Sequence, residues 1–120
     1  MKLVTFTFNG TTSIGAISGD HVVDFSNSSL PKNMIDFIAL GDQGLDTAKN
    51  LIDKSENKIE LSKAHLEAPI TKPSKILAVG LNYKEHQDEV AQTAAKTIGK
   101  AQEKYPNIFN KQNSSVNGPY

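Results

Sequence analysis

The chain has no cysteine, no arginine and no tryptophan. The lack of cysteine and of arginine counts against several classes of function. Without cysteine there are no disulfides, no thiolate metal sites and no cysteine nucleophile. The thirteen basic residues are all lysines and are balanced by thirteen acidic residues, so the formal net charge is zero. Because nucleic-acid binding needs clustered positive charge and favours the guanidinium fork, we expect no nucleic-acid partner.

Long apolar runs are absent as well. The longest are far shorter than the roughly 20 residues that a membrane-spanning helix needs, so we expect no membrane partner. Strand-like residues follow Met1 directly, which gives no sign of a secretory signal. With no targeting signal recognised, the expected location is cytoplasmic. The 38% share of apolar residues predicts a thin core for a chain of 120 residues.

The first 25 residues predict an antiparallel β-meander. Apolar and polar residues alternate up to Phe8, which is the period of a strand. Asn9-Gly10 is a strong signal for a two-residue hairpin turn. Further strands are expected over 13–17 and 21–25, which completes a three-stranded meander.

Short helices are expected after the meander. Asn33 is a suitable N-cap for a helix over 34–40, and a second helix should open at Asp42 or Gly44. The lysines and carboxylates of residues 42–63 are expected to form an ordinary solvent-exposed surface. A short strand is expected over 58–61.

The composition of the sequence changes near Pro73. Residues 75–79 form a nearly continuous apolar run, as in a strand buried on both faces. A long helix is expected from Asn82 to about Lys104, followed by a short extended piece at Ile108-Phe109 and a polar loop over 110–120. The expected domains are therefore 1–72, a small α+β domain, and 73–120, the start of another.

Two small groups of residues are candidates for catalysis or for substrate binding. Asn82, His86 and Glu89 would share one face of the expected helix, where a carboxylate three residues away can orient an imidazole as a general base. The alternative is a solvated helix face with an incidental pair. Lys111 stands close to Ser114 and Ser115 in the expected loop, where a lysine can bind a carboxylate or an enolate. The alternative there is a solvated lysine.

Two motifs resemble the fumarylacetoacetate hydrolase (FAH) family. The first, Lys75–Glu89, is an apolar strand followed by Gly, any residue, Asn-Tyr, two residues, His, two residues and Glu. The second, Phe109–Pro119, has Phe-x-Lys, a Ser-Ser pair and Gly-Pro. The first 70 residues also resemble the small N-terminal domain of bacterial members, so the resemblance covers the whole chain.

The resemblance implies a fold class and an activity. The fold would be α+β: the N-terminal meander with short helices, then the first strand, helix and loop of a mainly-β catalytic domain. The activity would be hydrolysis or isomerisation of 2-oxo or 2,4-dioxo acids, with C–C hydrolysis of an acylpyruvate-type substrate foremost. His86 and Glu89 would activate water. The implied substrate-binding residues are Lys111, Ser114, Ser115, Asn82 and Tyr83.

The resemblance also implies a cofactor and a partner. Family members use Mg²⁺, or Mn²⁺ or Ca²⁺, held by a Glu-x-Glu pair and an Asp that lie beyond the Phe-x-Lys motif. We therefore expect this chain alone to hold no metal and to be inactive. A homodimer is expected, because an unpaired apolar strand edge invites pairing with another chain; a swapped arrangement, or disorder beyond about Pro73, is the alternative to that dimer. The alternative is a stand-alone, non-catalytic binding or regulatory module that pairs with a longer homologue.

Overall fold

The computed structural model describes residues 1–54, 56–80, 82–85, 88–89, 92 and 105–119. They fall into two compact units, here named unit 1 (Met1–Lys72 with Val116–Tyr120) and unit 2 (Pro73–Ser115). The expected division into domains 1–72 and 73–120 stays a prediction, because a compact unit is not by itself an independently folding domain. Within the described part of the chain, no helix is long and apolar enough to cross a bilayer.

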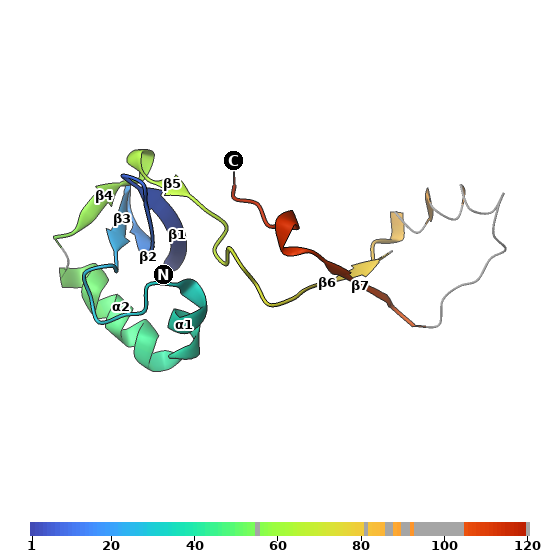
Figure 1. Cartoon of the computed structure of the whole chain (residues 1–120), viewed down its shortest axis with the longest axis horizontal. Helices are drawn as coiled ribbons and strands as arrows, with labels where there is room; N and C mark the ends of the chain where they lie inside the picture. Colours follow the sequence, from blue (N-terminus) through green and yellow to red (C-terminus); the bar gives the residue numbers. More distant parts are fainter. Residues whose placement is uncertain (55, 81, 86–87, 90–91, 93–104, 120) are drawn as a thin grey trace. The chain divides into compact units, whose positions relative to one another are not determined.

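Unit 1 is built on a five-stranded antiparallel sheet in the order β4-β3-β2-β1-β5 (Figure 1). The strands are β1 (Lys2–Phe8), β2 (Thr11–Ser18), β3 (His21–Asp24), β4 (Lys58–Glu60) and β5 (His65–Leu66).

The expected meander is confirmed by the pairing of the first three strands. The turn between β1 and β2 uses Asn9 and Gly10, whose φ angles of 49° and 76° are both positive. Positive φ at both central residues is what a type I′ hairpin turn requires. The local sequence therefore sets the register, in which Phe8 pairs with Thr11.

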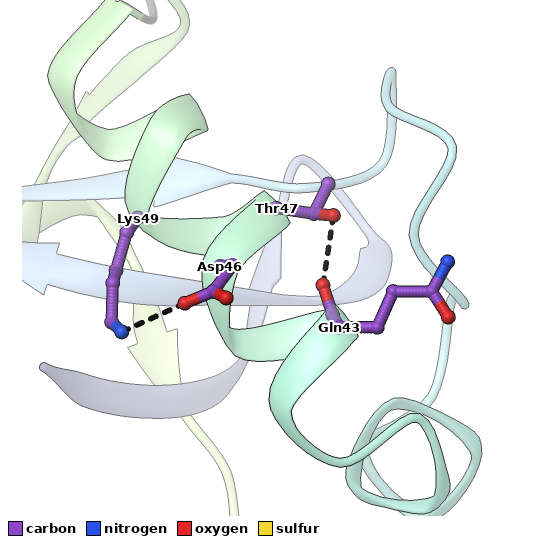
Figure 2. A network of polar contacts seen from close by, with 4 residues as sticks. All are labelled: Gln43, Asp46, Thr47 and Lys49. Atoms are coloured by element: carbon purple, nitrogen blue, oxygen red, sulfur yellow. Dashed lines mark hydrogen bonds and ion pairs between the residues drawn. The ribbon is translucent and has the colours of Figure 1, made fainter.

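Two helices follow the meander, as expected. Helix α1 (Met34–Ala39) begins at Asn33, whose side chain accepts a hydrogen bond of 2.9 Å from the Asp36 amide. Helix α2 (Asp42–Lys54) carries its polar side chains outward. Figure 2 shows two of the contacts on that face: Lys49 Nζ donates to Asp46 Oδ1 at 2.9 Å, and Thr47 Oγ1 donates to the Gln43 carbonyl at 2.9 Å.

The core of unit 1 consists of two apolar clusters. The larger one joins β2 and β3 to the helices, and the fully buried Phe25 and Phe37 rings lie 6.0 Å apart within it. The smaller cluster is centred on Phe6 and Val22, and Ala64 lies against them. Every buried apolar side chain in the described structure belongs to unit 1.

Unit 2 is organised around one antiparallel strand pair, β6 (Ile76–Gly80) and β7 (Asn107–Lys111), which Figure 1 shows side by side. The expectation that β6 is buried on both faces is wrong for this structure, since Leu77 is 68% exposed and Val79 is 48% exposed. The physical reason is that, among the described residues, only β7 pairs with it. The long helix expected from Asn82 lies mostly outside the described residues; Lys84, Glu85, Asp88, Glu89 and Gln92 are described as helical.

Candidate functional site

The β6–β7 pair positions the candidate residues of unit 2. Its register places Ile76 opposite Lys111, Ala78 opposite Phe109 and Gly80 opposite Asn107. Directly opposed residues of an antiparallel pair share a face, so Lys111 lies on the face of Ile76, Ala78 and Phe109. A lysine at the end of an apolar strip is placed to meet a ligand that has an apolar part and a charged end.

Lys111, Ser114 and Ser115 lie close together along the chain. Lys111 is the last residue of β7, and Ser114 and Ser115 belong to the 3₁₀ turn η2 (Asn113–Ser115) that follows. The Ser115 amide donates to the Gln112 carbonyl at 2.9 Å, which closes this turn. All three residues are exposed, so their side chains are free to approach a solute.

The placement of Lys111 in a polar loop is therefore corrected. Lys111 ends a strand, because pairing with Ile76 fixes its backbone despite the polar residues around it. Ser114 and Ser115 do lie outside the strand, in the turn. A strand end is a more defined position than a loop, and the lysine is held in register with β6.

Asn82 and Tyr83 lie at the other end of β6. Both follow Gly80 and are exposed, Tyr83 to 73%. Gly80 and Ile76 are four residues apart, roughly 13 Å along a strand. The strand pair alone therefore does not bring Asn82 and Tyr83 to Lys111.

The expected pair of His86 and Glu89 is described only in part. His86 lies outside the described residues, so its contact with Glu89 stays a prediction. Glu89 is exposed and helical, and it takes part in an interaction.

The described residues do not form a metal centre by themselves. Among them, no group of three or more histidine, aspartate or glutamate side chains is placed to hold an ion. Of the candidate residues that are described, Glu89 is the one carboxylate. Hard divalent ions prefer several oxygen ligands, so these residues do not fit an ion on their own.

The end of the second motif packs within unit 1. The segment after η2 belongs to unit 1, and Gly118 approaches the backbone of Leu66 closely. A Gly-Pro pair is a local turn signal, but nothing in the sequence alone indicates that it packs against residues about fifty positions earlier.

Comparisons with known proteins place the chain in a family. It is 34% identical over 125 aligned residues, 99% of its length, to oxaloacetate tautomerase fahd2, mitochondrial, of Xenopus laevis. Over 85% of its length it is 35% identical to oxaloacetate tautomerase Fahd2a, mitochondrial, of Rattus norvegicus. Over 99% it is 32% identical to FAH domain-containing protein 2 homolog of Dictyostelium discoideum. No family model matches the sequence.

A solved structure shares the fold. Maleylpyruvate hydrolase from Sphingobium sp. SYK-6, solved with manganese(II) and pyruvate, superposes with a TM-score of 0.62 at 24% identity, over 99% of this chain and 40% of that one. The α+β fold class expected from the sequence is thereby confirmed. The chain spans 37% of the Xenopus relative and 31% of the rat relative, so it corresponds to about a third of each.

The expected cytoplasmic location is wrong. The Xenopus, rat and Bos taurus relatives are named as mitochondrial proteins, which conflicts with it. The expectation depended only on the lack of a recognised targeting signal, and such a lack does not define a compartment.

The family expected from the two motifs is confirmed, because relatives that carry its name align with nearly the whole chain. The chain belongs to the fumarylacetoacetate hydrolase family.

Proposed function

We propose that the protein containing this chain interconverts the keto and enol forms of a 2-oxo dicarboxylic acid. The observation that carries the proposal is the 34% identity, along 99% of the chain, to an oxaloacetate tautomerase. C–C hydrolysis of an acylpyruvate-type substrate, which the resemblance put first, is the second candidate. Both reactions pass through an enol or enolate of a 2-oxo acid, so the same residues would serve either one.

Tautomerisation moves one proton from the carbon beside the ketone to the ketone oxygen. A base must take the proton, and a positive or hydrogen-bonding group must stabilise the oxyanion until a proton returns to oxygen. We assign the base to His86, oriented by Glu89. In the hydrolytic alternative the same pair would take a proton from water.

We assign the oxyanion to Lys111. The lysine ends β7 at a fixed register and is exposed, so its ammonium group can approach a developing negative charge. Ser114 and Ser115 follow in the turn and would donate hydrogen bonds to a substrate carboxylate. Asn82 and Tyr83 follow the other end of β6, and their part in substrate binding would need an approach to Lys111 that the strand pair alone does not provide.

The proposal also includes a divalent metal ion as cofactor. When bound to a 2-oxo acid, such an ion stabilises the enolate as a Lewis acid. We propose Mg²⁺, with Mn²⁺ or Ca²⁺ as alternatives; the structural neighbour was solved with manganese(II). The described residues do not fit an ion on their own, so its ligands would have to come from other parts of the protein.

We also propose a homodimer. Its support is the apolar surface of the β6–β7 pair, where Leu77, Val79 and Ile108 are exposed together on one face. The same exposure favours the non-catalytic alternative, a module that pairs with a longer homologue. Co-purification of the tagged 120-residue chain with such a homologue, without any gain in turnover, would support that alternative.

The test is an assay of the protein expressed from its whole reading frame. The decay of enol absorbance of oxaloacetate is followed with Mg²⁺, with Mn²⁺ and with a chelator, and acylpyruvate hydrolysis is followed in parallel. We expect faster tautomerisation with an ion and loss of that rate with the chelator. A protein that accelerates neither reaction with any of the ions would contradict the proposal. We expect the 120-residue chain alone to be inactive in both assays.

A further inference from the structure

The sheet of unit 1 ends at the short strand β5, whose outer side pairs with no other strand in the described part of the chain. Leu66 pairs with Phe6, and the Glu67 amide donates to the Thr5 carbonyl at 2.9 Å. Residues of an antiparallel ladder alternate between exchanging hydrogen bonds with the partner strand and turning their N–H and C=O groups away from it. Because Glu67 bonds to β1, the backbone groups of Leu66 and Ala68 on either side of it face the open edge.

Threonine side chains of β1 and β2 fix the segment that carries this edge. Thr5, only 6% exposed, donates from Oγ1 to the Pro69 carbonyl at 2.7 Å. Thr7 Oγ1 donates to Glu67 Oε1 at 2.8 Å and shares a further 2.8 Å hydrogen bond with Thr12 Oγ1. The open edge is therefore a fixed row of backbone groups, which is the form that a strand of another chain can pair with.

Residues 116–119, here named the edge segment, belong to unit 1. Val116 and Gly118 are half-buried, whereas Asn117 and Pro119 are exposed. Such an alternation with a period of two is typical of an extended chain that lies with one side against a surface. Pro119 has no N–H group and cannot donate to a ladder, so the edge segment is itself a poor template for a further strand.

Gly118 brings the edge segment close to the backbone of the open edge. A Cβ atom at position 118 would lie 3.2 Å from the Leu66 carbonyl oxygen, and 3.6 Å from both the Ala68 nitrogen and the Glu67 carbonyl carbon. These are backbone atoms, so they cannot rotate aside as a flexible side chain can. The φ angle of Gly118 lies outside the left-handed region, so a substitution there would test the close approach alone.

We propose that the edge segment shields the open edge of β5 from pairing with a second copy of this chain. Natural proteins cover exposed strand edges because unpaired backbone groups invite association. The lack of a side chain at Gly118 lets the edge segment lie directly on the Leu66 carbonyl, where a strand of another copy would otherwise bond. The contact lies within unit 1, and the proposal does not depend on the proposed activity.

Docking of the edge segment can be tested directly because the chain contains no cysteine of its own. An Asn117→Cys variant carries a single nitroxide label, and the amide signals of Leu66, Glu67 and Ala68 are followed by NMR. We expect the label to broaden these signals strongly. Adding Gly118→Val should weaken the broadening, because overpacking lowers the ratio of docked to undocked segment by about tenfold or more.

Shielding is tested by self-association in sedimentation velocity. Gly118→Val is compared with Asn117→Ala, the matched control that changes an exposed neighbour, and both carry Leu77→Lys to disfavour association through the β6–β7 pair. We expect Gly118→Val to lower the apparent dissociation constant by about tenfold, because that constant varies inversely with the fraction of chains whose edge is open. Chemical-shift changes with concentration should centre on the Leu66 and Ala68 amides.

The proposal is overturned if the label leaves the three amides sharp, or if Gly118→Val does not weaken their broadening. It is also overturned if Gly118→Val releases the edge segment without strengthening self-association, or if the shift changes avoid Leu66 and Ala68. Should Gly118→Val fail to fold by circular dichroism, Gly118→Ala adds only the Cβ atom and gives the same comparison with a smaller effect. None of these readouts depends on turnover, so failure of the proposed function would be seen separately, in the enzyme assay.

Discussion

At the scale of single residues, Gly15 is the glycine with the least room for a side chain among those that the structure describes. A Cβ atom there would overlap the Val23 carbonyl oxygen and would lie 3.1 Å from Val22 Cγ1 and 3.2 Å from Phe6 Cε1. Gly15 pairs with Asp24 in the ladder between β2 and β3. The two strands can approach this closely only because the residue has no side chain.

We predict that Gly15→Ala destabilises the chain by about 3 kcal/mol, the upper part of the range for overpacking a core. Urea unfolding followed by circular dichroism would measure the change. Gly80→Ala is the matched control, because a Cβ atom there meets nothing closer than 3.5 Å. Equal unfolding midpoints for the two variants would contradict the prediction.

Lys49 gives a prediction about pH. The hydrogen bond that Lys49 donates to Asp46, followed by the charges of Asp46 and Asp42, raises the pKa of Lys49 above the ordinary value of 10.5 (Figure 2). A raised folded-state pKa means that the contact stabilises the folded chain fully below pH 10.5. That contribution is lost as the pH rises through the folded-state pKa. Since both side chains are exposed, the effect on stability is small.

Replacing the carboxylate should therefore lower the titration midpoint of Lys49. In Asp46→Asn we expect an NMR titration of the Lys49 side chain to move toward pH 10.5. Thr47→Ala is the control, because Thr47 bonds to the Gln43 carbonyl and not to Lys49. A midpoint that stays where it is in Asp46→Asn would show that another group raises this pKa.

At the scale of elements, the β6–β7 pair differs from every strand of unit 1. Leu77, Val79 and Ile108 are 68%, 48% and 59% exposed and share one face of the pair. A two-stranded pair is marginally stable in water without a covering layer. Its apolar face and its edges are therefore ready to pair with another surface.

We predict that Leu77→Lys weakens self-association of the chain by about tenfold or more in dissociation constant, since burying a leucine contributes about 1.5–3 kcal/mol. Sedimentation velocity over a range of concentrations would measure it. Ile35→Lys is the control, because Ile35 is also an exposed aliphatic residue, at 49%, but lies on α1 in unit 1. If Ile35→Lys dissociates the assembly and Leu77→Lys does not, the interface lies on unit 1.

Elements with local signals could be predicted from the sequence. The meander followed from strand periodicity and from Asn9-Gly10, and α1 followed from its cap at Asn33. The pairing of β4 with β3 and of β5 with β1 could not be predicted, because each joins residues more than thirty positions apart. No pattern among neighbouring residues indicates such a pairing.

The same distinction applies to the candidate site. The proximity of Lys111 to Ser114 and Ser115 follows from their closeness in the chain. Lys111 ends a strand because it pairs with Ile76, which is distant in the sequence. The polar residues from Asn110 to Asn113 are typical of a loop, so the end of this strand could not be predicted. The contact of Gly118 with Leu66 could not be predicted either, because it also joins residues that are distant in the sequence.

At the scale of the whole molecule, the two units differ in what holds them together. Unit 1 has two buried clusters, whereas the described part of unit 2 contains no buried apolar side chain. Unit 1 should therefore unfold cooperatively by itself. The candidate catalytic and substrate-binding residues all fall within the range of unit 2. The proposed activity is therefore tested on the protein expressed from its whole reading frame.

The decisive test at this scale is the charge of Lys111 in the protein expressed from its whole reading frame. If its ammonium group stabilises the oxyanion, Lys111→Met should lower kcat by a factor on the order of 10²–10³, the effect of removing one such group. KM should change little, because the interaction strengthens as charge develops on the oxygen. Lys75→Met is the matched control, since Lys75 is also an exposed lysine beside the strand pair and should leave kcat unchanged. If Lys111→Met raises KM and leaves kcat intact, the lysine binds the substrate carboxylate in the ground state, and the oxyanion is stabilised by another group.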